Sequence, residues 1–312
     1  MQARGNNCKH HAIIPKEKPM PNYHLITDSS CDIPQEFKAK YQFSVTDLII
    51  NIAGKSYLDR KEITSAEVLK LFRETKSMPK TSTLNIAELM GVLKNGLEGY
   101  DHLFYLPISS KTSSEFDYAR MAVQEMGLED KITILDSLSL CTGNGIEAMA
   151  ILDDFERNLS VEDIIQNHND RAKRVVMDFT LDNMEALHKG GRCSGLAYLI
   201  GNKFHIHPII THRKGHMEVK GLVRGRDITN AVEKLTENFR KNFESGNIDL
   251  NYPVFIAEIE CQERAEKVRK ELQKLVGDRM VHIVSASGII VCHTCCETLG
   301  LSYVTRKAPE EN

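Results

Sequence analysis

The sequence predicts an α/β protein of two domains, the first of which contains a parallel sheet covered by helices. From Tyr23 onward, apolar runs rich in β-branched residues alternate with amphipathic helical patterns, which is typical of strands joined by helical crossovers. The chain has 312 residues, the length of two average domains of about 150 residues. We therefore expect an N-terminal α/β domain at 23–160 and a C-terminal α/β domain at 161–312, preceded by a disordered tail at 1–22.

In the first domain, four apolar runs predict strands and three amphipathic patterns predict helices. One of these helices has a clear start, because Thr64 and Glu67 have the spacing of a capping box. Pro34 lies in the first turn of another, where the N–H that proline lacks is not needed. The strands are expected at 23–30, 43–54, 102–109 and 131–137, and the helices at 33–41, 64–75 and 114–126.

Two helical patterns lead into the second domain, and Ser160 is the expected N-cap of the second of them. Residues 204–225 contain two alternating runs around an Arg-Lys-Gly turn, which predicts an antiparallel hairpin. The helices are expected at 143–158, 160–173, 227–243 and 262–275, and the other strands at 174–180, 254–260 and 280–286, the last of these being the final clear strand.

Composition excludes several classes of protein. The 40 Lys and Arg are balanced by 43 Asp and Glu, there is no Trp, and the net charge is −3, so the basic surface of a nucleic-acid binder is not expected. No apolar run approaches the roughly 20 residues that span a bilayer. Residues 1–22 lack the apolar centre of a signal peptide. Eight scattered cysteines indicate reduced thiols. We expect a cytoplasmic protein.

Hydroxyl side chains gather where predicted strands end. They occur at 27–30, at 107–114 and in the loop 78–85. In open α/β sheets ligands lie at the carboxyl ends of strands, and hydroxyl groups together with free helix N–H groups can bind an anion. The alternative is that each Ser or Thr is simply a helix N-cap.

A cluster at 292–296, Cys-His-Thr-Cys-Cys, is a candidate metal site. Cys292 and Cys295 form a CxxC pair that could begin a zinc site, with His293 and Cys296 beside it. A structural zinc site usually needs a second ligand pair, and the sequence offers none of matching spacing. We therefore expect no bound metal. A metal-sensing regulatory module that uses these Cys and His residues remains an alternative.

The segment 184–195, Met-Glu-Ala-Leu-His-Lys-Gly-Gly-Arg-Cys-Ser-Gly, predicts a short helix that stops abruptly. Gly190 or Gly191 explains the stop, since glycine readily adopts a left-handed conformation. Arg192 follows directly. It could serve only as a cation at the helix carboxyl end, or it could carry a positive charge toward a ligand or partner, which is our hypothesis.

Six segments together carry a resemblance to a known family, and they lie at 25–34, 81–83, 108–116, 181–195, 206–226 and 287–304. The most specific parts are the Gly-Gly-Arg segment and the closing His-Thr…Leu-Gly-Leu segment. In register over about residues 23–306, the chain resembles the DegV family, which includes the fatty-acid-binding subunit of bacterial fatty acid kinase.

The resemblance implies two α/β domains, the second with a mixed sheet, and a tunnel between or within them for one long-chain fatty acid. It implies that the protein is a carrier without catalytic power of its own and without a cofactor. A separate kinase catalytic subunit would convert the bound acid to an acyl phosphate. A transient contact with a membrane surface is a further expectation.

The resemblance also assigns residues. Thr81 and Ser113 fall on the family's carboxylate-binding hydroxyls, and His293 falls on the histidine near the carboxylate. We expect Ser82, Ser114, Arg192 and Thr294 to share the fatty-acid site, Asp28 and Ser29 to lie at the ligand mouth, and Arg224 and Arg226 to dock the kinase.

The chain departs from the family pattern at three places beside these residues. At 81–85 it reads Thr-Ser-Thr-Leu-Asn where the family usually reads Thr-Ser-Gln-Pro-Ser. Ser114 and Glu115 replace the usual Gly-Thr after Ser113, and Cys295, Cys296 and Glu297 replace a Gly-Pro-Gly turn. Losing those glycines is expected to crowd the backbone next to His293. A carboxylate of Glu115 or Glu297 would repel a bound anion if it pointed inward.

A Ser/His-dependent acyl hydrolase is the second alternative. Ser113, His293 and one aspartate could form a catalytic triad. The sequence around Ser113 lacks the G-x-S-x-G spacing of a nucleophile elbow, so this alternative depends on residue types alone.

Overall fold

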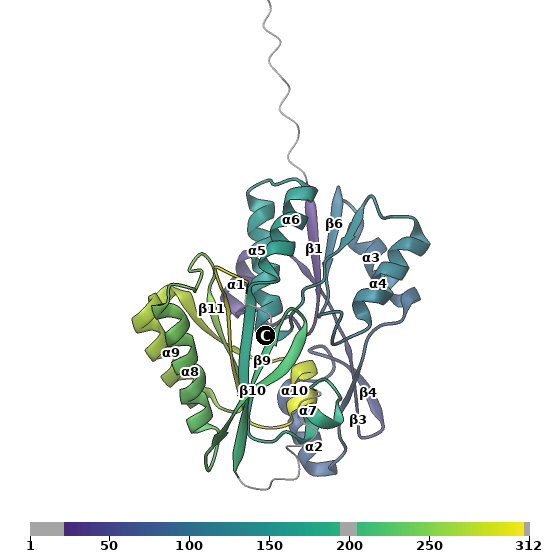
Figure 1. Cartoon of the computed structure of the whole chain (residues 1–312). Coiled ribbons are helices and arrows are strands. Elements are labelled where there is room, and N and C mark those ends of the chain that lie inside the picture. Colours follow the sequence, from purple (N-terminus) through teal and green to yellow (C-terminus); the bar gives the residue numbers. More distant parts are fainter. Residues whose placement is uncertain (1–21, 194–204, 309–312) are drawn as a thin grey trace, which may run out of the picture.

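The first half of the chain is built around a four-stranded parallel sheet (Figure 1). The computed structural model describes residues 22–193 and 205–308. The strands, in the order β2-β1-β6-β7, are β1 (Tyr23–Asp28), β2 (Ser44–Thr46), β6 (His102–Leu106) and β7 (Ile132–Ile134), and all three pairings are parallel. The predicted parallel sheet is confirmed.

Helices cover both faces of this sheet because its central strands are apolar on both sides. In β1, Leu25 packs toward one face and the next residue, Ile26, packs toward the other. α3 (Ile86–Leu97) and α4 (Glu115–Met126) cover the Ile26 face, and α5 (Cys141–Glu156) and α6 (Val161–Arg171) cover the Leu25 face. α1 (Gln35–Lys40) follows Pro34, and α2 (Ser65–Thr75) begins with the predicted capping box of Thr64 and Glu67.

A second, small sheet corrects the prediction of one strand at 43–54. The chain leaves the parallel sheet after Thr46, and Ile49 begins a new antiparallel sheet in the order β4-β3-β5. Leu48 is held at this corner, where its N–H donates to the Ser29 hydroxyl and its carbonyl accepts from the Asp59 N–H. The strands are β3 (Ile49–Ile52), β4 (Lys55–Leu58) and β5 (Lys80–Ser82), the last inside the predicted loop 78–85.

The second half forms a six-stranded mixed sheet in the order β10-β9-β8-β13-β11-β12, in which only β11 and β12 are parallel. The predicted hairpin is confirmed as β9 and β10. The prediction that 280–286 is the final strand is wrong, because β13 lies in the middle of this sheet. The strands are β8 (Val175–Leu181), β9 (Ile206–Arg213), β10 (His216–Arg224), β11 (Val254–Ile259), β12 (Val281–Ser285) and β13 (Thr298–Val304).

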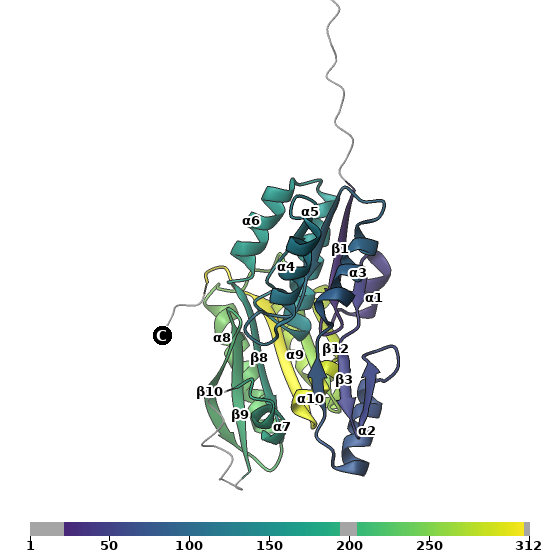
Figure 2. The same ribbon diagram turned by 90° about the vertical axis from the view of Figure 1, so that its right-hand side faces the viewer.

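The two faces of the mixed sheet have different neighbours. One face packs against α8 (Thr229–Glu244) and α9 (Gln262–Val276), which lie together on the outside of the molecule (Figures 1 and 2). The other face meets the first half of the chain, together with α7 (Glu185–Lys189) and α10 (Gly288–Thr294). A single 3₁₀ turn, η2 (Asp278–Met280), precedes β12. The site described below lies on this inner face.

α5 connects the two halves physically, since it contacts β1 on one side and β8, β11 and β13 on the other. The expected boundary near residue 160 stays a prediction. Of the expected tail at 1–22, residues 1–21 lie outside the described residues. In the part of the chain that the structure describes, no helix is long and apolar enough to cross a membrane.

Candidate functional site

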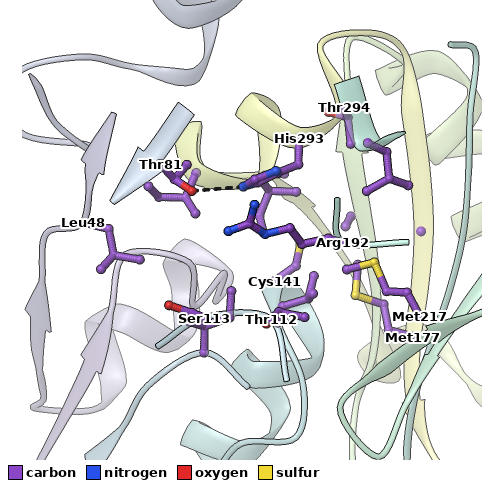
Figure 3. A pocket seen from close by; sticks show the side chains of 18 of the residues that line it. Leu48, Thr81, Thr112, Ser113, Cys141, Met177, Arg192, Met217, His293 and Thr294 are labelled. Atoms are coloured by element: carbon purple, nitrogen blue, oxygen red, sulfur yellow. Dashed lines mark hydrogen bonds between the residues drawn. The ribbon is translucent and has the colours of Figure 1, made fainter. Parts of the chain in front are cut away.

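A pocket of about 370 Å³ lies between the inner face of the mixed sheet and the first half of the chain (Figure 3). Its volume is in the range of about 300–1,000 Å³ that small-molecule sites occupy. Most of its wall is apolar, with side chains from both halves that include Leu48, Ile108, Met177, Phe179, Met217 and Ile289. We did not expect these residues from the sequence, although alternate positions of one buried strand, such as Met177 and Phe179, are bound to share a face.

The polar part of the wall contains every expected fatty-acid residue. Thr81 and His293 meet directly, with 3.1 Å between the Thr81 Oγ1 and the His293 Nε2, and Figure 3 shows this bond. Thr81 lies on β5, which pairs with β3 of the small sheet, and His293 lies on α10. The other members are Ser82, Ser113, Ser114, Arg192 and Thr294.

His293 is a neutral ring in this setting. Burial lowers the pKa of His293 to about 4, and the nearby Arg192 guanidinium lowers it further in the same direction. At neutral pH the ring therefore offers one N–H donor and one acceptor nitrogen rather than a charge. Arg192 is then the permanent cation in this part of the wall.

Ser113 lies in the turn that starts α4, and its hydroxyl oxygen accepts the N–H of Glu115 at 3.2 Å. The alternative interpretation as a helix-capping residue therefore describes part of what this side chain does. The hydroxyl proton is not used by that bond and can point to a ligand oxygen. The first N–H groups of α4 also favour a negative charge nearby.

Arg192 lies at the end of α7 and also lines the pocket. The hypothesis that it carries a positive charge toward a ligand or partner stays a prediction. α7 ends at Lys189 and Gly191 adopts a left-handed φ of 69°, so the predicted stop is confirmed. The Arg192 Nη1 donates to the Gly190 carbonyl at the helix end, and the side chain lines the pocket. In Figure 3 the guanidinium lies between Thr81 and Met177. Cys193 is the last residue described before the gap, so the predicted segment at 194–195 lies outside the described residues.

Gly190 allows α7 to pack against His293. A Cβ at this position would lie 2.8 Å from the His293 Nδ1 and 3.2 Å from the Ala186 carbonyl oxygen. We expect Gly190→Ala to displace the ring from Thr81 and to lower the free energy of unfolding by about 1–3 kcal/mol, measured by urea denaturation. Gly91→Ala in α3 is the control, because a Cβ there meets nothing within 4 Å. Equal stability of the two variants would contradict this role of Gly190.

Asp28 and Ser29 lie elsewhere than expected. Both are fully buried and neither is part of the pocket lining. Asp28 accepts the N–H of Ile108 at 2.5 Å, and the Ser29 hydroxyl accepts the N–H of Leu48 at 3.1 Å. They hold two lining residues from behind rather than forming the ligand mouth, because the end of β1 is covered by the neighbouring loops.

The two additional carboxylates do not point a negative charge into the pocket. Glu115 is the first residue of α4 and is fully buried, and the Tyr105 hydroxyl donates to its Oε1. Burial and the Asp28 carboxylate raise the pKa of Glu115 to about 8, so it is mostly protonated at pH 7. Glu297 instead pairs with the Arg264 Nη1 at 2.6 Å and lies outside the lining.

The Glu115 carboxyl should make ligand binding depend on pH. As the pH rises through about 8, this carboxyl loses its proton and becomes negative next to the Ser113 turn. We expect the affinity for a carboxylate ligand to fall by about tenfold between pH 7 and pH 9. Glu115→Gln should remove this dependence, as fluorescence titration at several pH values would measure. A fall of the same size in the variant would contradict the assignment.

α10 is held at its start by two aspartates of the first half. Asp32 Oδ2 accepts the N–H of Ser287 at 3.2 Å, and Asp59 Oδ1 accepts the N–H of Gly288 at 3.1 Å. Arg60 donates to Asp32 and lies next to Asp59. Burial raises the pKa of Asp59 to about 6. Because α10 carries His293, this cluster positions the histidine. No local signal in the sequence identifies this cluster.

The alternative functions find little support in the geometry. Among the described hydrogen bonds, none joins Ser113 to His293: His293 bonds to Thr81, and the Ser113 hydroxyl oxygen accepts from the Glu115 N–H. Among the residues that the structure describes, no group of three or more His, Cys, Asp or Glu could hold a metal ion. Burial raises the pKa of the Cys295 and Cys296 thiols, so both are protonated at neutral pH. Cys295 has a left-handed φ of 55°, the conformation that a glycine would adopt more easily.

Arg224 and Arg226 lie apart from the pocket. Arg224 is the last residue of β10 and Arg226 follows it in the turn toward α8, and both are exposed. β10 is also an edge strand of the mixed sheet. Both side chains are therefore accessible to another protein.

Comparisons with known proteins agree on one family. The family model described as DegV matches residues 22–306. The DegV domain-containing protein of Caldanaerobacter subterraneus is 31% identical over 247 residues, 78% of this chain and 87% of that protein. The structure described as "Fatty Acid Binding of a DegV family Protein from Thermus thermophilus" has a TM-score of 0.81 and 26% identity, and covers 91% of this chain and 99% of the other. DegV of Bacillus subtilis, described as a fatty acid binding protein, has a TM-score of 0.77 at 23% identity and covers 92% and 100%, which supports the fold alone.

Proposed function

This chain belongs to the DegV family, and from that premise we propose that it binds one long-chain fatty acid. The acyl tail occupies the apolar part of the pocket, and the carboxylate lies between Thr81, Ser113 and His293. The observation that carries the proposal is the pocket itself, which is apolar over most of its wall and has hydroxyl side chains from Thr81 and Ser113 in its polar part.

The apolar and polar parts of the pocket match the two parts of a fatty acid, its tail and its carboxylate. Burying the tail is favourable by about 0.8 kcal/mol for each methylene group, whereas the carboxylate must keep hydrogen-bond partners when it leaves water. Hydroxyl donors satisfy it without the tight neutralisation of a bidentate arginine. An oxygen held in this way remains able to attack a phosphoryl group.

We further propose that this protein acts as a carrier of the fatty acid, and that a separate kinase subunit supplies ATP. The exposed Arg224 and Arg226 at the end of β10 are the docking residues. Loading from a membrane surface is consistent with α4, where Tyr118 lines the pocket and is 37% exposed, and Met121 one turn later is 51% exposed.

We expect Arg224→Glu to weaken docking of a fatty acid kinase catalytic subunit from the same organism by at least about tenfold, because a charge at a protein interface is inverted. Fatty-acid binding should be unchanged, since Arg224 lies outside the pocket. Biolayer interferometry and lipid titration would measure the two effects. Lys94→Glu, an exposed residue of α3, is the control for the same change of charge. Loss of lipid binding with intact docking would contradict the assignment.

Ligand identification tests the proposed function most directly. The purified full chain would be denatured and extracted, and any released lipid would be identified by mass spectrometry. We expect about one long-chain fatty acid for each protein molecule. A protein that releases no fatty acid and does not bind added octadecanoic acid after delipidation would overturn the proposal.

A further inference from the structure

The tip of the β9–β10 hairpin, Lys214 and Gly215, lies against the first half of the chain. Both residues have a left-handed φ, 48° and 84°, which is the pattern of a type I′ hairpin turn. Gly215 is buried, and its N–H donates to the Leu138 carbonyl at 2.9 Å. This bond fixes the tip of a hairpin of the mixed sheet to the loop between β7 and α5.

The glycine at this tip also allows a close approach to a second loop of the first half. A Cβ on Gly215 would lie 2.8 Å from the Ser109 Oγ and 2.7 Å from the Lys111 Cγ. The Lys111 side chain is exposed and can move aside. Ser109 is fully buried, and its Oγ accepts the Lys111 N–H at 3.2 Å. The Ser109 hydroxyl could therefore move only by giving up that hydrogen bond.

The β3–β4 hairpin shows that the turn conformation alone does not create this contact. Its turn residues, Ala53 and Gly54, have the same pair of left-handed φ angles, 50° and 76°. A Cβ on Gly54 would nevertheless meet nothing within 4 Å. The two hairpins thus share a turn conformation but differ in how closely the glycine approaches a neighbouring segment.

Ser109 holds the residue that we place at the carboxylate. The Ser109 carbonyl oxygen accepts the N–H of Thr112 at 3.0 Å and the N–H of Ser113 at 3.1 Å. Thr112 and Ser113 both line the pocket. A binding site of this kind tolerates a displacement of its groups by only about 0.5 Å. A shift of Ser109 would therefore be transmitted to the Ser113 hydroxyl and would weaken its bond to a ligand.

We propose that the tip of the β9–β10 hairpin, through Gly215, positions Ser113 for the fatty-acid carboxylate. The inference rests on the proposed function and adds a positioning residue to it. Gly215 lies outside the pocket lining and acts by fixing Ser109, whose carbonyl holds the Ser113 turn. A part of the mixed sheet that does not line the pocket thus determines the geometry of a hydroxyl in the first half of the chain.

Paired titrations of the delipidated full-length protein test this role. Octadecanoic acid reports on the carboxylate site, and methyl octadecanoate has the same tail without the charge. We expect Gly215→Ala to weaken binding of the acid by about tenfold and of the ester by less than about twofold, because hydrogen bonds to a charged group are the stronger ones. Gly54→Ala is the matched control, since it places a Cβ in the same left-handed conformation without a contact. It should leave both affinities unchanged.

A second-site change identifies the contact that is responsible. Ser109→Ala removes the Oγ that the new methyl group would meet. Adding Gly215→Ala to the Ser109→Ala protein should therefore weaken binding of the acid by no more than about twofold further. If the effects of the two changes simply multiplied, the contact between Gly215 and Ser109 would not be the cause and the proposal would be overturned.

The outcomes separate this proposal from the proposed function. If the unaltered protein binds octadecanoic acid but Gly215→Ala weakens the acid no more than Gly54→Ala does, or weakens acid and ester equally, only the positioning role is overturned. Failure of the unaltered protein to bind any fatty acid would overturn both. If Gly215→Ala does not fold, amide hydrogen exchange of the unaltered protein decides the question. The amides of Gly215 and Ser113 should open together with equal free energies, and separate opening would overturn the positioning role.

Discussion

Replacing Thr81 with Val and Ser113 with Ala together should weaken binding of octadecanoic acid by roughly two to four powers of ten. Each hydroxyl donates to a buried carboxylate in the proposed complex, and a hydrogen bond to a charged group contributes about 1.5–3 kcal/mol. The two residues come from different elements, β5 and the turn before α4, so the double variant removes donors from two sides of the carboxylate. Fluorescence titration and the lipid content of the purified variant would measure the effect.

A matched control separates this effect from general damage to the small sheet. Lys55→Ala lies on β4 of the same sheet as Thr81, and Lys55 is exposed and outside the pocket lining. It should leave lipid binding unchanged. If the Thr81→Val, Ser113→Ala protein retained as much fatty acid as the control, the carboxylate would not lie where we propose.

Arg60→Met should lower the free energy of unfolding at pH 7 by about 3–5 kcal/mol, because it leaves the partner of a buried ion pair uncompensated. Arg60 donates to Asp32, which is 1% exposed, and its charge also lies beside Asp59, which is fully buried. The same aspartates hold the start of α10, so His293 should lose its fixed position as well. Urea denaturation would measure the stability.

The free energy of unfolding should depend on pH both in the unaltered protein and in this variant. The pKa of Asp59 in the folded protein is about 6, above its ordinary value of 3.8, so ionisation opposes folding. Stability should therefore fall as the pH rises from about 4 through 6, and the fall should continue to higher pH without Arg60, whose charge lowers the pKa of Asp59. The Asp32→Asn, Arg60→Met double variant should recover part of the loss, because it removes the unpaired charge. No recovery would contradict the account of Arg60 as the counter-ion.

Local signals in the sequence were sufficient to predict many of the helices and strands. The capping box of Thr64 and Glu67 starts α2 as predicted, and Ser160 is the N-cap of α6, with its hydroxyl accepting the N–H of Asp163. The alternation on either side of Lys214 predicted the β9–β10 hairpin. These features depend on residues within a few positions of one another, so they can be recognised without knowledge of the fold.

Other elements were missed because their environment comes from distant parts of the chain. β13 is buried on both sides, has Gly300 in its middle, and lies between β8 and β11, so it shows no alternation in the sequence. α3 was not predicted either. The run 43–54 has a continuous strand pattern, and only the contacts of Leu48 with Ser29 and Asp59 divide it into β2 and β3.

The sequence by itself determined the alternating strands and helices, the parallel first sheet and, through resemblance, the residue types expected at a carboxylate. Only the tertiary structure decided which of those residues meet. Thr81 and His293 are 212 positions apart and touch, whereas Asp28 and Ser29 lie behind the pocket wall. The raised pKa of Glu115 is also a tertiary property. The physical reason is that burial, hydrogen-bond partners and pKa depend on which segments surround a side chain, and local sequence does not contain that information.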